Sequence, residues 1–162
     1  PDKRFPNFLR RIGVAHNSVL AITETRLTEI KDPNAQAHLS LRIGVKPRPN
    51  TQNGHVVRLA VSFYDLTKDN KFKPTDARTA YDWLTRDRDW TDPSPKFLAA
   101  TYVRPKTQIA SVEGRRYGGF AVHVYFDGQL QDARANPPEL LTLFPAPDQV
   151  ALPPNAIAPS PH

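Results

Sequence analysis

Aromatic and charged residues gather in one short stretch of the chain, AYDWLTRDRDWTD at residues 80–92. It holds both tryptophans of the chain, Trp83 and Trp90, and an alternating run of arginine and aspartate. Exposed aromatic rings stack on sugars or bases, and arginine adds cation–π contacts or pairs with anionic groups. The sequence therefore offers a candidate ligand-binding site made of Trp90, Tyr81, Arg86 and Arg88.

The same stretch also has an architectural interpretation. Tyr81 and Trp83 are two residues apart, so in a strand they would share the face toward a core. Trp90 precedes the turn-forming DPSP, where its ring would cover an open end of a β-sandwich. A buried Trp90 would favour architecture, and an exposed one would favour binding. We favour architecture.

An oxygen-rich stretch and the histidines are the residues that could bind a metal ion. DLTKDNKFKPTD at residues 65–76 departs from the spacing of a calcium loop, and its three lysines would repel a cation. We interpret it as a polar connection in which aspartate forms turns. The histidines lack ligand spacing, and His123 alternates with apolar residues as an exposed or partly covered side chain would. We expect neither a metal nor a cofactor.

Motifs for catalysis are missing. The sequence has no nucleophile elbow, no P-loop and no dinucleotide fingerprint. The glycine-rich residues 114–120 lead into a strand, so they lack the helix N-terminus that holds a phosphate. Asp87, Asp89 and Asp92 have arginine neighbours, which favours solvated carboxylates over a glycosidase pair. We therefore expect a protein that is not an enzyme.

The elements that would position these residues are strands. Residues 37–47, 55–66 and 118–126 alternate strictly between apolar and polar side chains, as half-buried strands do. Asp127-Gly128 predicts a type I′ hairpin, and residues 136–144 predict a turn or two of helix. Weaker strand candidates are residues 10–16, 19–27, 78–84, 97–105, 107–113 and 129–135.

This pattern predicts an all-β protein with about seven to nine strands and little helix. We expect an antiparallel, immunoglobulin-like β-sandwich, with a jelly roll or an open barrel as the alternative. Residues 1–8 would form an extension, residues 9–144 the sandwich, and residues 145–162 a Pro-rich tail. The 17 prolines in 162 residues disfavour a helical bundle, because an interior proline breaks a helix.

Composition narrows the chemistry further. The chain has no cysteine, which excludes disulfides, thiol catalysis and thiolate metal sites. It begins with Pro1, so we expect that a leader was removed or that the chain is part of a longer protein. The formal net charge is +6, with basic residues concentrated only at residues 1–11. Nucleic-acid binding through that basic N-terminus is one alternative function.

The segment YGGFAVHVYFDGQLQDARANPPELL resembles exported immunoglobulin-like proteins of Verrucomicrobia that are encoded beside type-IV-pilus-like genes. In those proteins a strand, an acidic-glycine hairpin and an A-x-P-x-x-L segment recur together. The resemblance covers mainly residues 117–144 and, more loosely, residues 55–66. It implies an envelope-associated, non-enzymatic sandwich and carries over no site residues. The apolar N-terminal helix of a pilin is missing from this chain.

These observations lead to three expectations about function. The first is an exported protein, in the periplasm, at the outer membrane or at the cell surface, that contacts other envelope or pilus-like proteins or a second copy of itself. Strand addition at a sheet edge would be its contact mode, and a removed N-terminal segment would be its only link to a membrane. The second is a module that binds glycans or anionic polymers through the aromatic stretch. The third is the nucleic-acid binder.

Overall fold

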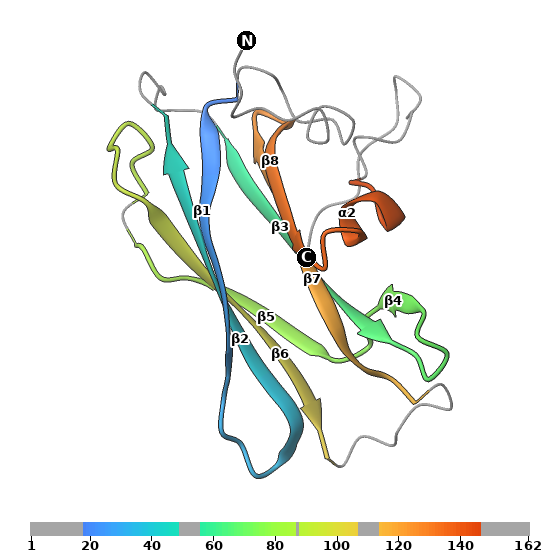
Figure 1. Cartoon of the computed structure of the whole chain (residues 1–162). Coiled ribbons are helices and arrows are strands. Elements are labelled where there is room, and N and C mark those ends of the chain that lie inside the picture. The colour runs from blue at the N-terminus through green and yellow to red at the C-terminus, as the bar shows by residue number, and fades with distance from the viewer. Residues whose placement is uncertain (1–17, 49–55, 87, 107–113, 147–162) are drawn as a thin grey trace.

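The strands with alternating side chains form two β-sheets that face each other (Figure 1). The computed structural model describes residues 18–48, 56–86, 88–106 and 114–146. In this part of the chain, eight strands form two four-stranded antiparallel sheets. The first sheet has the order β1 (Leu20–Glu29), β2 (Ala35–Pro47), β6 (Lys96–Pro105) and β5 (Arg78–Trp83). The second has the order β4 (Phe72–Pro74), β3 (Val57–Leu66), β7 (Arg116–Phe126) and β8 (Gln129–Asn136).

This strand order is that of the immunoglobulin fold. In that fold, the first, second, fifth and fourth strands form one sheet, and the third, sixth and seventh form the other. Here β1, β2, β6 and β5 take the places of the first group, and β3, β7 and β8 those of the second. The short strand β4 is an addition beside β3. The predicted immunoglobulin-like sandwich is confirmed.

Most of the predicted strands are present. All three strictly alternating segments became strands, as did the weaker candidates at 19–27, 78–84, 97–105 and 129–135. The candidates at 10–16 and 107–113 lie outside the described residues, as do the predicted extension 1–8 and the tail from residue 147. Strand β4 was missed, because three residues of a lysine-rich stretch carry no alternation.

The predicted hairpin and helical segment are also present. Asp127 and Gly128 have φ angles of 51° and 81°, the positive values that both central residues of a type I′ turn require. Helix α2 (Leu140–Leu143) lies within the predicted segment 136–144. None of the helices among the described residues is long and apolar enough to span a membrane.

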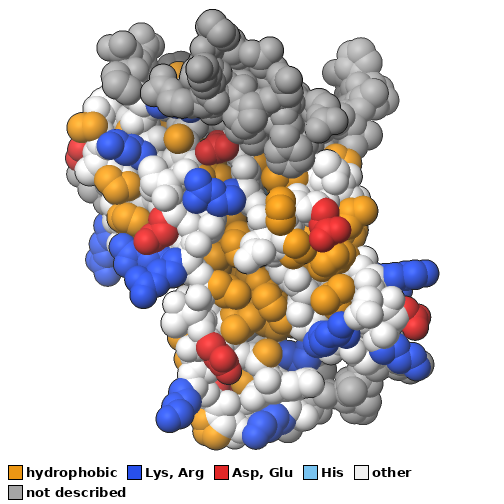
Figure 2. Space-filling view, viewed as in Figure 1, with side chains coloured by type: hydrophobic (Ala, Val, Ile, Leu, Met, Phe, Trp, Pro, Cys, Tyr) orange, Lys and Arg blue, Asp and Glu red, His pale blue; other side chains and the backbone are white. Residues whose placement is uncertain are grey.

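Two apolar clusters hold the fold together. The main core lies between the sheets and contains inward-facing residues of both, among them Leu41, Ile43, Tyr102, Val122 and Val124. The second cluster lies on the outer face of the second sheet, where α2 covers it (Figure 1). Its members include Tyr64, Ala121, Tyr125, Leu140 and Leu141. Figure 2 shows hydrophobic side chains gathered along the middle of the same view, between the two sheets.

Candidate functional site

Trp90, the first of the predicted binding residues, belongs to the core. Its side chain is only 7% exposed and lies in the main core between the sheets. The ring meets that of Trp83 edge to face, with the centroids 6.1 Å apart. This burial corrects the prediction of Trp90 as a ligand platform, because a buried ring has no free face on which a sugar or base could stack. The architectural interpretation is the one that fits.

A buried lysine holds the loop that carries Trp90. Lys96 is 1% exposed, and its Nζ lies 5.8 Å from the centroid of the Trp90 ring. The ammonium donates hydrogen bonds to the carbonyl oxygens of Asp92 at 2.9 Å and of Ser94 at 2.8 Å. These bonds satisfy a charge that would otherwise be costly to bury. They also fix the turn that follows Trp90.

The aspartates of this loop are committed to their own turns. Asp89 accepts hydrogen bonds from the hydroxyl and the amide of Thr91, and these lower the pKa of its carboxyl. Asp92 accepts a hydrogen bond from the amide of Ser94, which lowers the pKa of Asp92. Asp87 lies outside the described residues. The two described carboxylates therefore act as turn formers, not as a facing pair.

The other predicted binding residues lie near one edge of the sandwich. Tyr81 is 37% exposed, and its hydroxyl donates a 3.0 Å hydrogen bond to the carbonyl oxygen of Val61. The guanidinium of Arg88 lies 4.8 Å from the centroid of the Trp83 ring. Arg86 is exposed. The structure thus brings Tyr81 and Arg88 to the partly buried Trp83, while Trp90 packs underneath.

Tyr81 and Trp83 line a groove between the sheets. Its volume is about 190 Å³. It opens between β3 of the second sheet and β5 of the first, and Tyr81 bridges the two strands. Apolar side chains and polar groups share its lining, which consists of Leu59, Val61, Tyr81, Asp82, Trp83 and Leu98.

The backbone of β3 faces this opening with unpaired groups. β4 pairs only with Tyr64–Leu66, and the amide of Thr75 reaches the carbonyl of Phe63. Because strand residues alternate, the odd-numbered positions before Phe63 also direct their amides and carbonyls away from β7. The carbonyl oxygen of Val61 already accepts a hydrogen bond from the hydroxyl of Tyr81. In the part of the chain that the structure describes, no strand pairs with this side of residues 57–61.

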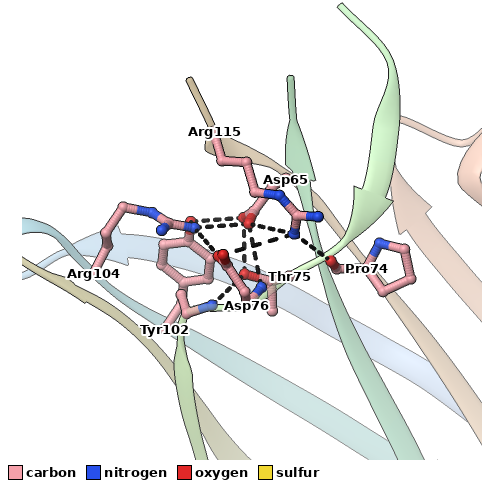
Figure 3. A network of polar contacts seen from close by, with 8 residues as sticks. Asp65, Pro74, Thr75, Asp76, Tyr102, Arg104 and Arg115 are labelled. Carbon is pink, nitrogen blue, oxygen red and sulfur yellow. Dashed lines mark hydrogen bonds and ion pairs between the residues drawn. The ribbon is translucent and has the colours of Figure 1, made fainter. Parts of the chain in front are cut away.

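The predicted polar connection at residues 65–76 supplies a buried network instead of a ligand site (Figure 3). Asp65 is fully buried and accepts hydrogen bonds from Thr75 at 2.8 Å, from Tyr102 at 2.8 Å and from Arg104 at 2.7 Å. Arg104 also bonds to Asp76 at 2.8 Å. Two sheets meet here, because Asp65 is on β3 and Arg104 on β6.

The electrostatics of the network follow from its paired charges. Arg115 lies 3.6 Å from Asp65 and 3.9 Å from Asp76, so two arginines face two aspartates. Burial alone would raise the pKa of Asp76, but its bond to Arg104 and the nearby guanidinium charges outweigh this and lower it. Burial and the bond to Asp65 raise the pKa of Tyr102 to about 12. The arrangement is a closed structural cluster.

A second hollow lies at the tip of the β1–β2 hairpin. Its volume is about 520 Å³, and its lining includes Glu29, Lys31, Asp32 and His38. Nδ1 of His38 lies 3.0 Å from a carboxylate oxygen of Asp32, and this hydrogen bond lowers the pKa of Asp32. Asp32 also caps the amide of Asn34, as a turn former does. Within the described ranges, no group of three potential metal ligands occurs.

The sequence predicts an exposed or partly covered side chain for His123, and the structure shows a buried one. It is 5% exposed and stacks against Tyr125, with the ring centroids 6.4 Å apart. The sequence pattern placed it on the outer face of its strand, which is correct for β7. It is nevertheless buried.

Sequence reasoning missed the residues that make the open edge. Leu59 and Val61 read as ordinary core positions, and their side chains do pack inward. Among the described strands, none pairs with the outer edge of residues 57–61, because β4 reaches only to Tyr64, and no residue pattern signals the length of β4. Comparison of the chain with protein families, with curated proteins and with solved structures finds no match.

Proposed function

We propose that this protein is an exported, non-enzymatic immunoglobulin-like domain that acts through protein–protein contacts in a cell-envelope or type-IV-pilus-like assembly. The observation that carries the proposal is the opening between β3 and β5, where a groove with apolar side chains lies beside a strand edge that no described strand pairs with. Exposed strand edges are sites at which other chains add to a sheet. The envelope location rests on the resemblance at residues 117–144.

The character of the groove favours a polypeptide over a glycan. Trp90, the residue on which glycan stacking depended, is buried. One face of the Trp83 ring is covered by Arg88, so this ring also lacks the open platform that sugars use. Unpaired amides and carbonyls beside apolar side chains match the backbone and side chains of an extended peptide.

Photo-crosslinking in the native host tests the proposal. A photoreactive phenylalanine at Asp82 or at the 52%-exposed Leu84 would lie beside the groove. The matched control is the same residue at Thr28, which is exposed on β1. We expect the first two positions to crosslink one envelope or pilus-like protein, which mass spectrometry identifies, and the control position to leave it unlabelled.

Fractionation of the same cells provides the second measurement. The full-length gene product should be found in the envelope or outside the cell. A full-length product that stays in the cytoplasm, without a leader or anchor, would contradict the proposal whatever the crosslinks show.

A further inference from the structure

The sheet edges differ in how well they are protected against a new strand. The first residues of β1 are covered by side chains of β8. Asp132 accepts a hydrogen bond from the amide of Ile22 at 2.8 Å, and Arg134 donates one to the carbonyl oxygen of Ile22 at 2.9 Å. The remaining residues of β1 include the charged residues Glu24, Arg26 and Glu29. Charged side chains are a common protection of edges, because a neighbouring strand would have to desolvate them.

The edge of β5 is protected in the same way. Arg78 and Asp82 lie on the strand itself, and Arg86 and Arg88 follow it directly. By contrast, residues 57–61 of β3 hold a single charge, that of Arg58. Its guanidinium is turned to the outer face of the sheet, 4.4 Å from the centroid of the Tyr125 ring. Of these three described edges, residues 57–61 of β3 therefore form the one without a charged side chain at the edge.

The β3 edge also has a defined length. It begins near Val57 and ends at Val61, where the hydroxyl of Tyr81 already occupies the carbonyl. Beyond this point, the amide of Thr75 and then β4 take over the pairing. An added strand of about five residues would span this edge, at about 3.3 Å per residue.

The residues opposite the edge set the chemistry of such a strand. Val57, Leu59 and Val61 direct their side chains inward, so alternate side chains of an added strand would point into the groove toward Trp83 and Leu98. β5 runs opposite to β3 (Figure 1), so the end of β5 at Trp83 lies toward the start of β3. Arg88 sits on the Trp83 ring there, and one of its nitrogens donates to the carbonyl of Thr85 at 3.2 Å. Asp82 also lines the groove, but successive side chains of a strand point to opposite faces, so the charge on the Trp83 side is that of Arg88. This positive charge favours an acidic residue in the strand where it meets Arg88.

We infer that residues 57–61 of β3 accept, in antiparallel pairing, an extended partner segment with alternating apolar side chains and an acidic residue near its C-terminal end. Antiparallel pairing places the C-terminal end of the segment at the start of β3, beside Arg88. The inference rests on the proposed function and specifies its contact. The partner's backbone would bond to the amides and carbonyls of Val57 and Leu59 and to the amide of Val61.

A synthetic peptide tests this contact without knowledge of the natural partner. The probe is a seven-residue peptide of alternating valine and threonine with one glutamate next to its C-terminal end. Titrated into the ¹⁵N-labelled protein, it should shift the amide signals of Val57, Leu59 and Val61 and slow their hydrogen exchange. Absence of binding at roughly 1 mM would overturn the inference, because a five-residue ladder beside a groove with apolar side chains should exceed that affinity.

Backbone methylation of the peptide makes the test specific. N-methyl groups on the alternate amides that face β3 should abolish binding, whereas methyl groups on the other set should leave it nearly unchanged. Equal losses for the two sets would contradict strand pairing. Moving the glutamate to the N-terminal end should weaken binding about twofold to fivefold, the range for an exposed charge pair, and Arg88→Gln should remove that preference.

Two variants of the protein provide a matched pair. Leu59→Ala and Leu59→Pro both remove the leucine side chain, but only proline removes the outward amide, which the β3–β7 ladder does not use. We expect Leu59→Pro to bind the peptide roughly fivefold to tenfold more weakly than Leu59→Ala, the value of one hydrogen bond. Equal binding would overturn the inference. Should Leu59→Pro fail to fold, the methylated peptides still decide.

The outcomes separate this inference from the proposed function. Crosslinks to an envelope protein without peptide binding would retain the proposed function and reject the β3 contact. Self-association in the ultracentrifuge that protects the β3 amides without peptide would assign the edge to a second copy and overturn the inference. Peptide binding in a protein that stays in the cytoplasm would retain the contact and reject the envelope assignment.

Discussion

The carboxylate of Asp65 on β3 lies 2.7 Å from the guanidinium of Arg104 on β6, so a buried ion pair joins the two sheets of the sandwich (Figure 3). Antibody domains join the corresponding sheets with a disulfide. This chain has no cysteine, and the ion pair is a polar link between the same two layers. Its side chains are 0% and 4% exposed.

Removing Asp65 should therefore destabilise the fold strongly. Asp65→Ala leaves the charge of Arg104 buried beside fewer partners, which costs about 3–5 kcal/mol in other proteins. Urea unfolding followed by circular dichroism measures the loss. Asp69→Ala, at an exposed position four residues away, serves as the control and should change the unfolding free energy by less than about 0.5 kcal/mol.

Coupling between the two charges provides a second measurement on the same pair. Arg104→Met alone should also be destabilising. The double variant should lose clearly less than the sum of the single losses, because the second substitution removes the charge that the first left unpaired. Additive losses would show that the pair does not act as a unit.

Asp76 should make the stability depend on pH. The pKa of its carboxyl is lowered by Arg104 and Arg115 against the effect of burial, so the folded state holds the ionised form more strongly than the unfolded state does. This contribution is present above the unfolded pKa of 3.8 and is lost as the pH falls from there through the folded value. Asp76→Asn should flatten the dependence of the stability on pH below about pH 4.

Urea midpoints across this pH range measure the effect. Asp69→Asn is the matched control, since its carboxyl is exposed. If Asp76→Asn leaves the slope unchanged, the acid sensitivity of the fold arises elsewhere.

The strands were predictable because each carries its own signal. Leu39, Leu41, Ile43 and Val45 alternate with polar residues whichever strand lies beside them, and the sequence shows this directly. Asp127-Gly128 likewise encodes its hairpin by backbone preference alone. The sandwich then follows from the number of such strands and the turns between them.

The candidate site was predictable only in part. Tyr81 and Arg88 were identified from aromatic and basic character; Tyr81 lines the groove, and Arg88 lies over Trp83, which also lines it. Trp90 has the same character, but its burial depends on Lys96 holding the following turn, which involves backbone carbonyls. The partnerships of Asp65 with Tyr102 and Arg104 span 37 and 39 residues of sequence. Such distant pairings follow from strand order and leave no local pattern.

The two tryptophans should respond differently to a quencher. Single-tryptophan variants made by Trp83→Phe and Trp90→Phe leave Trp90 and Trp83, respectively, as the only source of fluorescence. Trp90, at 7% exposure, should be quenched weakly by acrylamide and emit at shorter wavelength than the partly buried Trp83. Equal quenching of the two variants would contradict the placement of Trp90 in the core.

Gly119 should be intolerant of any side chain, because β7 and the segment before α2 approach each other closely there. A Cβ at this position would collide with the carbonyl oxygen of Asn136 and would lie 2.8 Å from atoms of Leu140 and Pro137. Gly119→Ala should therefore displace the segment that covers the second cluster and cost about 1–3 kcal/mol, the usual range for overpacking. Amide exchange at Leu141, together with urea unfolding, measures both effects.

Ala121→Ser, at a fully buried position two residues along the same face, is the companion variant. It adds an oxygen without crowding the backbone and should leave α2 in place. Faster exchange at Leu141 in Gly119→Ala alone would assign the effect to the close approach, whereas the same change in both variants would assign it to general loosening of the cluster.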